Sequence, residues 1–466
     1  MSHSNDSAAA LRIREVLDKN SFVELGAYVT ARSTDFNLAE RDTPGDGVVT
    51  GYGTIEDRLV YIYSQDPAVL GGSVGEMHAK KIRKLYDLAV RMEAPVIGLI
   101  DCSGLRLQEA SDSLNALGEL YRCQTLASGV VPQIQAIYGT CGGSLAVSAS
   151  IADFTFMEKE RGRLFMHTAN ALSRSEGAPD TASPEFQSAE SGVADFVGTA
   201  SELAEGIRKL VSILPASFED DPSYAECQDS LNRLVPEAEE ADAAALLKVI
   251  SDDGFVCEPG KEYGACVKTA FIRLNGCTVG AVAAISEELC ADGIEKAGSF
   301  VRFCDAFSIP LLTLVDASGL EKSVASERQM AKKAAALIAA YAGATVPKVT
   351  VVTGKAYGLV YNLFAPKASA DIVYAWENAE IGLMNAGDAV KVIYAAELDR
   401  AEDKTALYNE KTAAYAALQN GVVSAARRGY VDDMIAPQLT RKRVIAAFEM
   451  LFTKNEDVPA KKHGTV

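Results

Sequence analysis

Glycine-rich segments occur twice in the chain, each directly after an apolar run that predicts a strand. The first covers residues 139–144 and the second covers residues 354–360. In open α/β sheets, ligands bind beyond the carboxyl ends of the strands. Glycine lets a backbone approach a ligand closely, and consecutive N–H groups at a helix start can hold an anion. Both segments are therefore candidate oxyanion sites, although a tight strand-to-helix turn would require the same glycines.

Few other side chains suggest chemistry. Asp101 and Asp316 each end an apolar run and could act as acids or bases, but we favour carboxylates that cap the following turn. Cys141 has no neighbouring histidine, which favours a small buried residue over a nucleophile. We expect His78 to face solvent. His167 could line a cleft, which is the weaker interpretation of that residue.

An internal repeat organises the chain. Residues 95–105 match residues 310–320 at an offset of 215 (310 minus 95), and the same offset relates Gly143 to Gly358. The offset holds without a gap across about fifty residues. This predicts two copies of one α/β unit and an active site shaped by two similar halves.

Strands alternate with helices in both copies, which indicates mostly parallel sheets. A capping box at Ser73 and Glu76 predicts a helix start, and the acidic stretch at 215–245 is expected to be a linker. We predict strands at 47–55, 59–63, 96–100, 133–138, 270–274, 278–284, 310–315 and 349–353, and helices at 108–127, 298–307 and 325–342.

Composition excludes several classes of protein. The 466 residues are 48% hydrophobic and 23% charged, without an apolar run that could span a membrane or a secretory signal, so we expect a cytoplasmic protein of two or three domains. The net charge of −18 argues against nucleic acid as a partner. The basic run at 80–84 could bind a phosphorylated ligand, but a solvated helix face is the favoured interpretation. Nine cysteines without a Cys-x-x-Cys pair, and only four histidines, make a metal site unexpected.

Several segments resemble the carboxyltransferase subunits of biotin-dependent acyl-CoA carboxylases and the α subunits of related decarboxylases. The resemblance runs from about residue 10 to residue 450 and is collectively specific. It rests on residues 47–55, 64–66, 71–78, 126–132, 300–310 and 344–358.

The resemblance implies two tandem crotonase-like domains of the ClpP/crotonase superfamily. Residues 1–225 would bind acyl-CoA and residues 240–466 would bind biotin. It also implies a homo-oligomer, usually a hexamer, with active sites at dimer interfaces. Biotin would arrive carboxylated on a separate carrier protein, with a biotin carboxylase or a membrane decarboxylase subunit as a further partner. The substrate would be a short acyl-CoA such as propionyl- or methylmalonyl-CoA.

By position, the resemblance places the hole for the acyl-CoA enolate at Gly143 and Ser144 and the hole for biotin at Leu359 and Val360. It implies further substrate contacts at Ser103, Gly104, Arg106, Gly142, Gly358 and Asn362. The chain departs from the family, whose usual patterns are Ala-Gly-Gly-Ala and Tyr-Gly-Gly-Ala in the two segments. The loop after Asp316 also differs.

Three alternatives remain open. The chain could be the α subunit of a sodium-pumping decarboxylase that acts on methylmalonyl- or glutaconyl-CoA. It could be a catalytically degenerate structural subunit of a mixed ring. It could also be a CoA-thioester hydratase or hydrolase, which would need a carboxylate such as Glu109 or Glu119 to face the first oxyanion hole.

Overall fold

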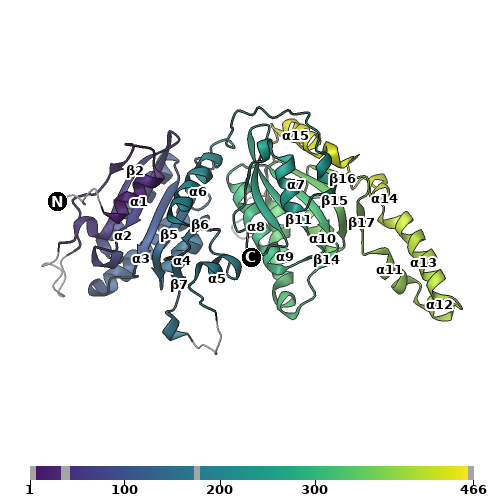
Figure 1. The fold of residues 1–466 in the computed structure, drawn as a ribbon, viewed down its shortest axis with the longest axis horizontal. Helices are drawn as coiled ribbons and strands as arrows, with labels where there is room; N and C mark the ends of the chain where they lie inside the picture. The colour runs from purple at the N-terminus through teal and green to yellow at the C-terminus, as the bar shows by residue number, and fades with distance from the viewer. Residues whose placement is uncertain (1–6, 33–41, 173–178, 460–466) are drawn as a thin grey trace. The chain divides into compact units, whose positions relative to one another are not determined.

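The computed structural model describes residues 7–32, 42–172 and 179–459, which belong to two compact units (Figure 1). The first unit comprises Met1–Ser223 and Pro259–Tyr263. The second comprises Tyr224–Glu258 and Gly264–Val466. Each unit has its own hydrophobic core. None of the helices in the described ranges is long and apolar enough to traverse a bilayer.

The first unit contains a sheet in the order β1-β2-β3-β4-β5-β6-β8, with β7 paired to the end of β5. Pairing is antiparallel among β1, β2 and β3 and parallel from β3 onward. Helices α2, α3 and α4 pack together on one face, and α1 packs with α6 on the other (Figure 1). The elements are β1 (Val23–Glu24), β2 (Val48–Ile55), β3 (Arg58–Gln65), β4 (Val96–Cys102), β5 (Gln133–Gly142), β6 (Phe154–Glu158), β7 (Arg163–Phe165), β8 (Phe196–Gly198), α1 (Ala8–Val16), α2 (Glu76–Met92), α3 (Ala110–Ala127), α4 (Leu145–Ile151), α5 (Pro184–Ala189) and α6 (Ala200–Ile213).

The second unit repeats this topology, with the order β18-β16-β15-β13-β11-β10-β9 and β17 paired to β15. A separate two-stranded sheet joins β12 to β14. The strands are β9 (Val256–Cys257), β10 (Lys268–Leu274), β11 (Cys277–Ile285), β12 (Glu288–Leu289), β13 (Leu311–Ala317), β14 (Gly319–Leu320), β15 (Lys348–Tyr357), β16 (Ile372–Trp376), β17 (Glu380–Gly382) and β18 (Asp433–Ile435). The helices are α7 (Ala243–Ile250), α8 (Ala291–Ala306), α9 (Val324–Gly343), α10 (Leu359–Phe364), α11 (Ala386–Ile393), α12 (Ala395–Arg400), α13 (Lys404–Tyr415), α14 (Val422–Arg427) and α15 (Thr440–Leu451).

The internal repeat predicted from the sequence is confirmed strand by strand. The bounds of β4 and β13 differ by 215 residues, as do those of β5 and β15. Both copies also carry a register shift at the same place, between Ile100 and Cys102 in β4 and between Val315 and Ala317 in β13. The predicted class, α/β with mostly parallel sheets, is therefore confirmed.

The predicted capping box at Ser73 and Glu76 is wrong. Helix α2 begins after Gly75, which has no side-chain cap. The Ser73 hydroxyl donates instead to the carbonyl of Leu70, and the Glu76 N–H donates to the Glu109 carboxylate at 2.6 Å. A tertiary contact thus replaces the local cap. Helix α8 likewise begins earlier than predicted, at Ala291 rather than residue 298.

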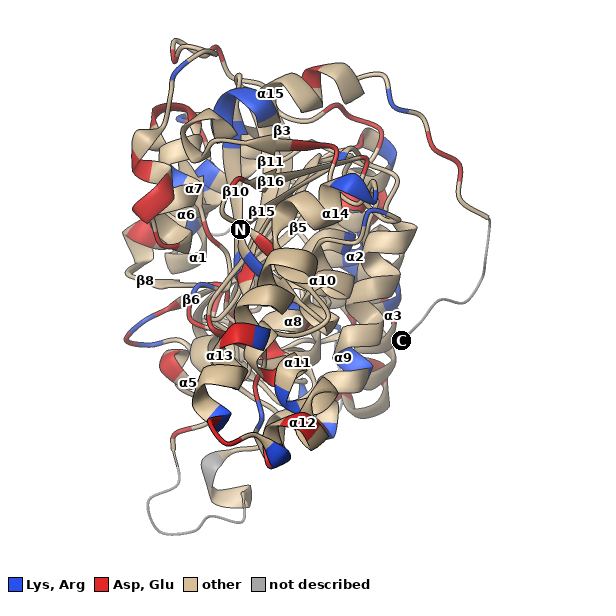
Figure 2. Ribbon diagram, turned by 90° about the vertical axis from the view of Figure 1, so that its right-hand side faces the viewer, with Lys and Arg blue, Asp and Glu red and all other residues tan. Residues whose placement is uncertain are grey.

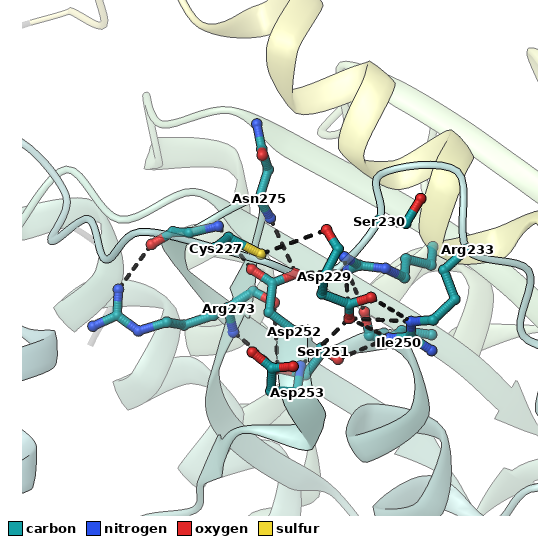
Figure 3. Close-up of polar contacts among 12 residues, drawn as sticks. Cys227, Asp229, Ser230, Arg233, Ile250, Ser251, Asp252, Asp253, Arg273 and Asn275 are labelled. Carbon is teal, nitrogen blue, oxygen red and sulfur yellow. Dashed lines mark hydrogen bonds and ion pairs between the residues drawn. The ribbon is translucent and has the colours of Figure 1, made fainter.

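The acidic stretch expected to be a linker contains the boundary between the two units, after Ser223, and its later part is folded into the second unit (Figure 3). Arg233 donates to Asp229 at 2.8 Å and to the carbonyl of Ser251 at 3.0 Å. Asp252 accepts the N–H of Gly276 at 2.7 Å. Its carboxylate also pairs with the wholly buried Arg441 at 2.7 Å. Asp229 and Arg233 of this stretch therefore form a specific ion pair that composition alone does not distinguish from solvated charge.

Candidate active site

Five of the predicted residues come together at the carboxyl edge of the first sheet. Strands β4 and β5 are parallel neighbours, so their ends meet. A side chain on Gly104 would lie 3.8 Å from the carbonyl oxygen of Gly142, so the loop after β4 lies against the end of β5. The residues gathered here are Ser103, Gly104, Gly142, Gly143 and Ser144.

Most of the first glycine segment, residues 139–142, belongs to strand β5, and only its end forms a turn. The strand runs to Gly142, and the chain reverses only at Gly143, which has a φ of +64°. The Gly143 N–H donates to the carbonyl of Phe165 at 2.8 Å, which extends the β5–β7 pairing. In the described part of the chain, the N–H groups of Ser144 and Leu145 donate to no carbonyl, as expected at a helix start.

The second glycine segment has the same geometry. Gly358 has a φ of +53°, and its N–H donates to the carbonyl of Gly382 at 2.9 Å. The next two residues, Leu359 and Val360, open α10, and within the described residues their N–H groups also meet no acceptor. Because the positive φ falls on Gly358, the side chains that replace the usual small residues cause no backbone strain. Val360 is wholly buried, whereas Leu359 is 40% exposed.

The repeat therefore pairs Ser144 with Leu359 and Leu145 with Val360. In both copies the positive-φ glycine uses its own N–H for a short extra strand, and the following two N–H groups stay available. The geometry thus favours Ser144 and Leu145 as the first donor pair, and Gly143 supplies the turn. Tyr121 of α3 donates its hydroxyl to the carbonyl of Ser144 and so helps to fix this turn.

Asp101 and Asp316 accept backbone N–H groups, as we favoured, but from a neighbouring strand and not from the following turn. The Asp316 carboxylate accepts the N–H of Lys355 at 2.8 Å, on the adjacent strand β15 and not in the following turn. Asp101 lies beside β5 in the same way and also pairs with Arg12 at 2.6 Å. A side chain on Gly139 would overlap the Asp101 carboxylate, and one on Gly354 would overlap that of Asp316. These two glycines make room for aspartates.

Arg106 lies beneath the candidate site. Its side chain is wholly buried and pairs with Asp46 and, at 2.8 Å, with Glu109. It also donates to the carbonyl of Ser73 at 2.7 Å. Burial raises the pKa of Asp46 to about 6, although Arg106 acts in the opposite direction. With these partners, Arg106 fixes the loop after β4 and does not present its charge to a ligand.

Neither carboxylate considered for a hydratase or hydrolase faces the glycine segment. Glu109 is wholly buried against Arg106. Glu119 pairs with Arg83 of α2 at 2.6 Å. The hydratase alternative therefore loses both carboxylates that the sequence offered for it.

The expectation that His78 faces solvent is wrong. The side chain is wholly buried, and Nδ1 lies 2.9 Å from the carbonyl of Asp46 while Nε2 lies 3.2 Å from the amide nitrogen of Gln65. Burial lowers the pKa of His78 to about 3, so the imidazole is neutral at physiological pH. The spacing of His78 with Ile82 and Leu85 on one face of α2 was the signal that could have revealed this.

The basic run of α2, drawn blue in Figure 2, is largely engaged within the protein. Lys80 pairs with Glu76 at 2.6 Å, and Arg83 pairs with Glu119. Lys81 is buried, donates to the carbonyl of Gly45 at 2.8 Å and has its pKa lowered to about 8 by burial. The expected solvated face is therefore wrong for Lys81, whereas the side chains of Lys80 and Arg83 are 47% and 42% exposed.

The remaining candidate residues differ in burial. Cys141 is buried, as predicted, and burial raises the pKa of its thiol. His167 is exposed after β7, and Asn362 is exposed on α10. Sequence reasoning missed Phe165 and Gly382, whose carbonyls accept the glycine N–H groups, because three-residue strands give no periodic signal.

Comparisons with known proteins agree with this architecture. A family model described as a carboxyl transferase domain matches residues 3–466. A propionyl-CoA carboxylase beta chain of Roseobacter denitrificans is 41% identical, covering 98% of this chain and 92% of the relative. A methylmalonyl-CoA decarboxylase subunit alpha of Propionigenium modestum is 38% identical, covering 99% and 93%. A solved transcarboxylase 12S, described as a hexamer with hydrolyzed methylmalonyl-coenzyme A bound, superposes with a TM-score of 0.93 at 36% identity and covers 99% of this chain and 93% of its own.

Proposed function

Because the chain belongs to the carboxyl transferase family, we propose that it moves a carboxyl group between carboxybiotin and the α-carbon of a short acyl-CoA. The two units are crotonase-like. The observation that carries the proposal is the matched pair of glycine turns, each followed by two backbone N–H groups without an acceptor among the described residues. Propionyl- and methylmalonyl-CoA are the substrates that the names of the relatives support.

The first unit stabilises the enolate. A carboxyl group can join or leave the α-carbon only if negative charge develops on the thioester oxygen, and N–H groups aimed at that oxygen lower the barrier. Ser144 and Leu145 supply such groups, and the loop at Ser103 and Gly104 borders the same edge. Removing one donor of this kind typically lowers kcat by about 100- to 1,000-fold.

The second unit would hold biotin through Leu359 and Val360. Their N–H groups can donate to the ureido oxygen, and the buried side chain of Val360 leaves the donor face clear. Carboxybiotin, when its carrier protein is bound, supplies the carboxyl group. The Leu359 side chain is 40% exposed beside this donor pair, and we expect it to narrow access for biotin.

We further propose a hexamer in which the first domain of one subunit (1–225) meets the second domain of another (240–466). The hexamer assembly named for the transcarboxylase 12S supports this arrangement. The partners would be a biotin carboxyl carrier protein and either a biotin carboxylase or a membrane decarboxylase subunit. All nine cysteines are free thiols, which supports a reducing compartment such as the cytoplasm.

Decarboxylation is the second candidate function. The decarboxylase α subunit of Propionigenium modestum is nearly as similar as the carboxylase chain, at 38% against 41% identity. The same enolate serves both directions, so the donor pairs do not separate them. The degenerate-subunit alternative is less favoured, because the substitutions at Leu359 and Val360 leave the backbone donors in place.

The test is transfer of a labelled carboxyl group from malonyl-, methylmalonyl- or glutaconyl-CoA to free biotin, with purified full-length protein. We expect biotin-dependent label transfer from one of these thioesters. Omitting biotin is the matched control, and release of labelled CO2 without biotin would instead indicate a decarboxylation that does not use biotin. Tight acyl-CoA binding in calorimetry without any transfer, even with carrier-linked biotin, would favour the structural-subunit alternative.

A further inference from the structure

Two cysteines of the second unit lie in contact at the start of helix α8. Cys290 caps this helix, and its Sγ accepts the N–H of Gly293 at 3.4 Å. The Sγ of Cys266, from the turn before β10, lies 3.0 Å from the backbone nitrogen of Cys290. A side chain on Gly293 would overlap that sulfur, so this glycine admits it. The Cys266 sulfur thus lies directly against Cys290, and the two side chains interact, as a disulfide between them requires.

The equivalent place in the first unit holds an ionic clamp. Asp46 lies two residues before β2, as Cys266 lies two residues before β10. Gly75 precedes α2 as Cys290 precedes α8. In the first unit, Asp46 accepts the N–H of His78 at 2.7 Å and pairs with Arg106. The same junction of strand, helix and loop is thus held by charges in one copy and by two thiols in the other.

The surroundings favour reaction at Cys290. The interaction with the Cys266 side chain, aided by the Gly293 N–H, lowers the pKa of Cys290, while burial and Asp292 oppose this shift. Lys296 of the same helix interacts electrostatically with both sulfurs and with Glu258, and burial lowers its pKa to about 8. Both cysteines are only partly buried, so a small oxidant can reach them. Reactive thiols are typically thiolates in partly exposed, electropositive places.

We propose that Cys266 and Cys290 form a site of reversible oxidation, at which a peroxide converts the two thiols into an intrachain disulfide. The Cys290 thiolate attacks one oxygen of hydrogen peroxide, the O–O bond breaks, and the departing hydroxide takes a proton to give water. The Cys266 sulfur then attacks the sulfenic acid, the S–O bond breaks, and a second water leaves. Two thiols and one peroxide thus give one disulfide and two waters, a two-electron oxidation.

The disulfide would act on the second donor pair through neighbouring strands. Cys290 directly follows β12, which pairs with β14, and β14 contacts α10. A covalent link to the turn before β10 would restrain this edge beside Leu359. We expect oxidation to lower carboxyl transfer and dithiothreitol to restore it. This consequence rests on the proposed function, whereas the formation of the disulfide does not.

The test is peptide mapping of the full-length protein. Reduced protein is treated with hydrogen peroxide at pH 7, alkylated, digested without reductant and analysed by mass spectrometry. We expect a peptide pair joined through Cys266 and Cys290, the loss of two thiols per chain, and recovery with dithiothreitol. In Cys290→Ser, where serine keeps the helix cap, no link forms. In Cys266→Ser, Cys290 remains as a sulfenic acid that dimedone traps.

The matched control is Cys277, a partly buried cysteine on β11 of the same unit. Burial raises its pKa from an ordinary 9.0. Because its neighbours favour the Cys290 thiolate whereas burial opposes that of Cys277, we expect peroxide to oxidise Cys290 several times faster than Cys277. Equal rates at Cys290 and Cys277, or peroxide treatment that leaves residues 266 and 290 unlinked, would overturn the proposal. Both readouts are independent of enzymatic activity.

Discussion

Replacing Arg106 by methionine would show whether the first half-site is held by its buried ion cluster. Methionine keeps much of the side-chain length but removes the charge. The change leaves Asp46 and Glu109 without their cation in a site where all three side chains are wholly buried. It also removes the donor to the carbonyl of Ser73. The loop after β4 would lose the contacts that place it against the glycine segment.

The expected cost is large because the remaining carboxylates cannot be solvated. Removing one partner of a buried ion pair costs about 3–5 kcal/mol. For a unit of this size, each kcal/mol lowers Tm by about 2–4 °C, so Arg106→Met should unfold about 6–20 °C below the wild type. The matched control is Arg83→Met, whose side chain and that of its partner Glu119 are each 42% exposed. An exposed pair contributes about 0–1 kcal/mol.

The pH dependence of the Tm loss shows whether uncompensated charge causes it. The pKa of buried Asp46 is already raised to about 6 with Arg106 present, and it should rise further in Arg106→Met. The folded variant then binds a proton that the unfolded chain lacks, so its stability falls as pH rises through this range. We expect the deficit to shrink between pH 7.5 and pH 5.5, and to shrink also when Asp46→Asn is added at pH 7.5.

The assay is differential scanning calorimetry of the assembled protein at both pH values. A Tm loss for Arg106→Met no larger than that of Arg83→Met would refute the reasoning. A large loss that neither acid pH nor Asp46→Asn relieves would show that packing, and not uncompensated charge, is the cause.

Four further substitutions test other parts of the structure. Gly139→Ala and Gly354→Ala should each destabilise the protein by about 1–3 kcal/mol in denaturant titrations because the new methyl group meets an aspartate. The control Gly343→Ala places its methyl group in open space and should be neutral. Equal effects of all three would contradict the role of Gly139 and Gly354 in making room for the aspartates. Leu359→Ala should lower the KM for biotin in the transfer assay. Because this side chain is 40% exposed, the free energy of unfolding should change by less than about 1 kcal/mol. An unchanged KM would mean that Leu359 does not restrict the access of biotin to the second donor pair. His78→Gln should lower the free energy of unfolding by about 1–3 kcal/mol at neutral pH. Because the pKa of His78 is about 3 in the folded protein, wild-type stability falls as pH drops below about 6.5, and the difference from the variant should shrink by up to about 1.4 kcal/mol per pH unit. A difference that stays constant from pH 7 to pH 4 would show that His78 is not buried in its neutral form.

Much of the fold could be read from local patterns. Short apolar runs ended by aspartate or glycine predicted β4, β5, β13 and β15, and the constant offset predicted their duplication. These signals survive because apolar periodicity and glycine placement are properties of neighbouring residues. The boundaries were less reliable, since the strands at 133–138 and 349–353 continue to Gly142 and Tyr357.

The sequence by itself determined that the chain has two similar halves and that paired glycine turns are the candidate chemistry. Only the tertiary structure decided which N–H groups remain free, because the acceptors of Gly143 and Gly358 lie on short strands about twenty residues later. The structure likewise showed that His78, expected at the surface, and Arg106, expected to contact substrate, are buried and hold neighbouring segments in place. Hydrogen-bond satisfaction and desolvation depend on residues far apart in the sequence, so no local pattern could reveal them.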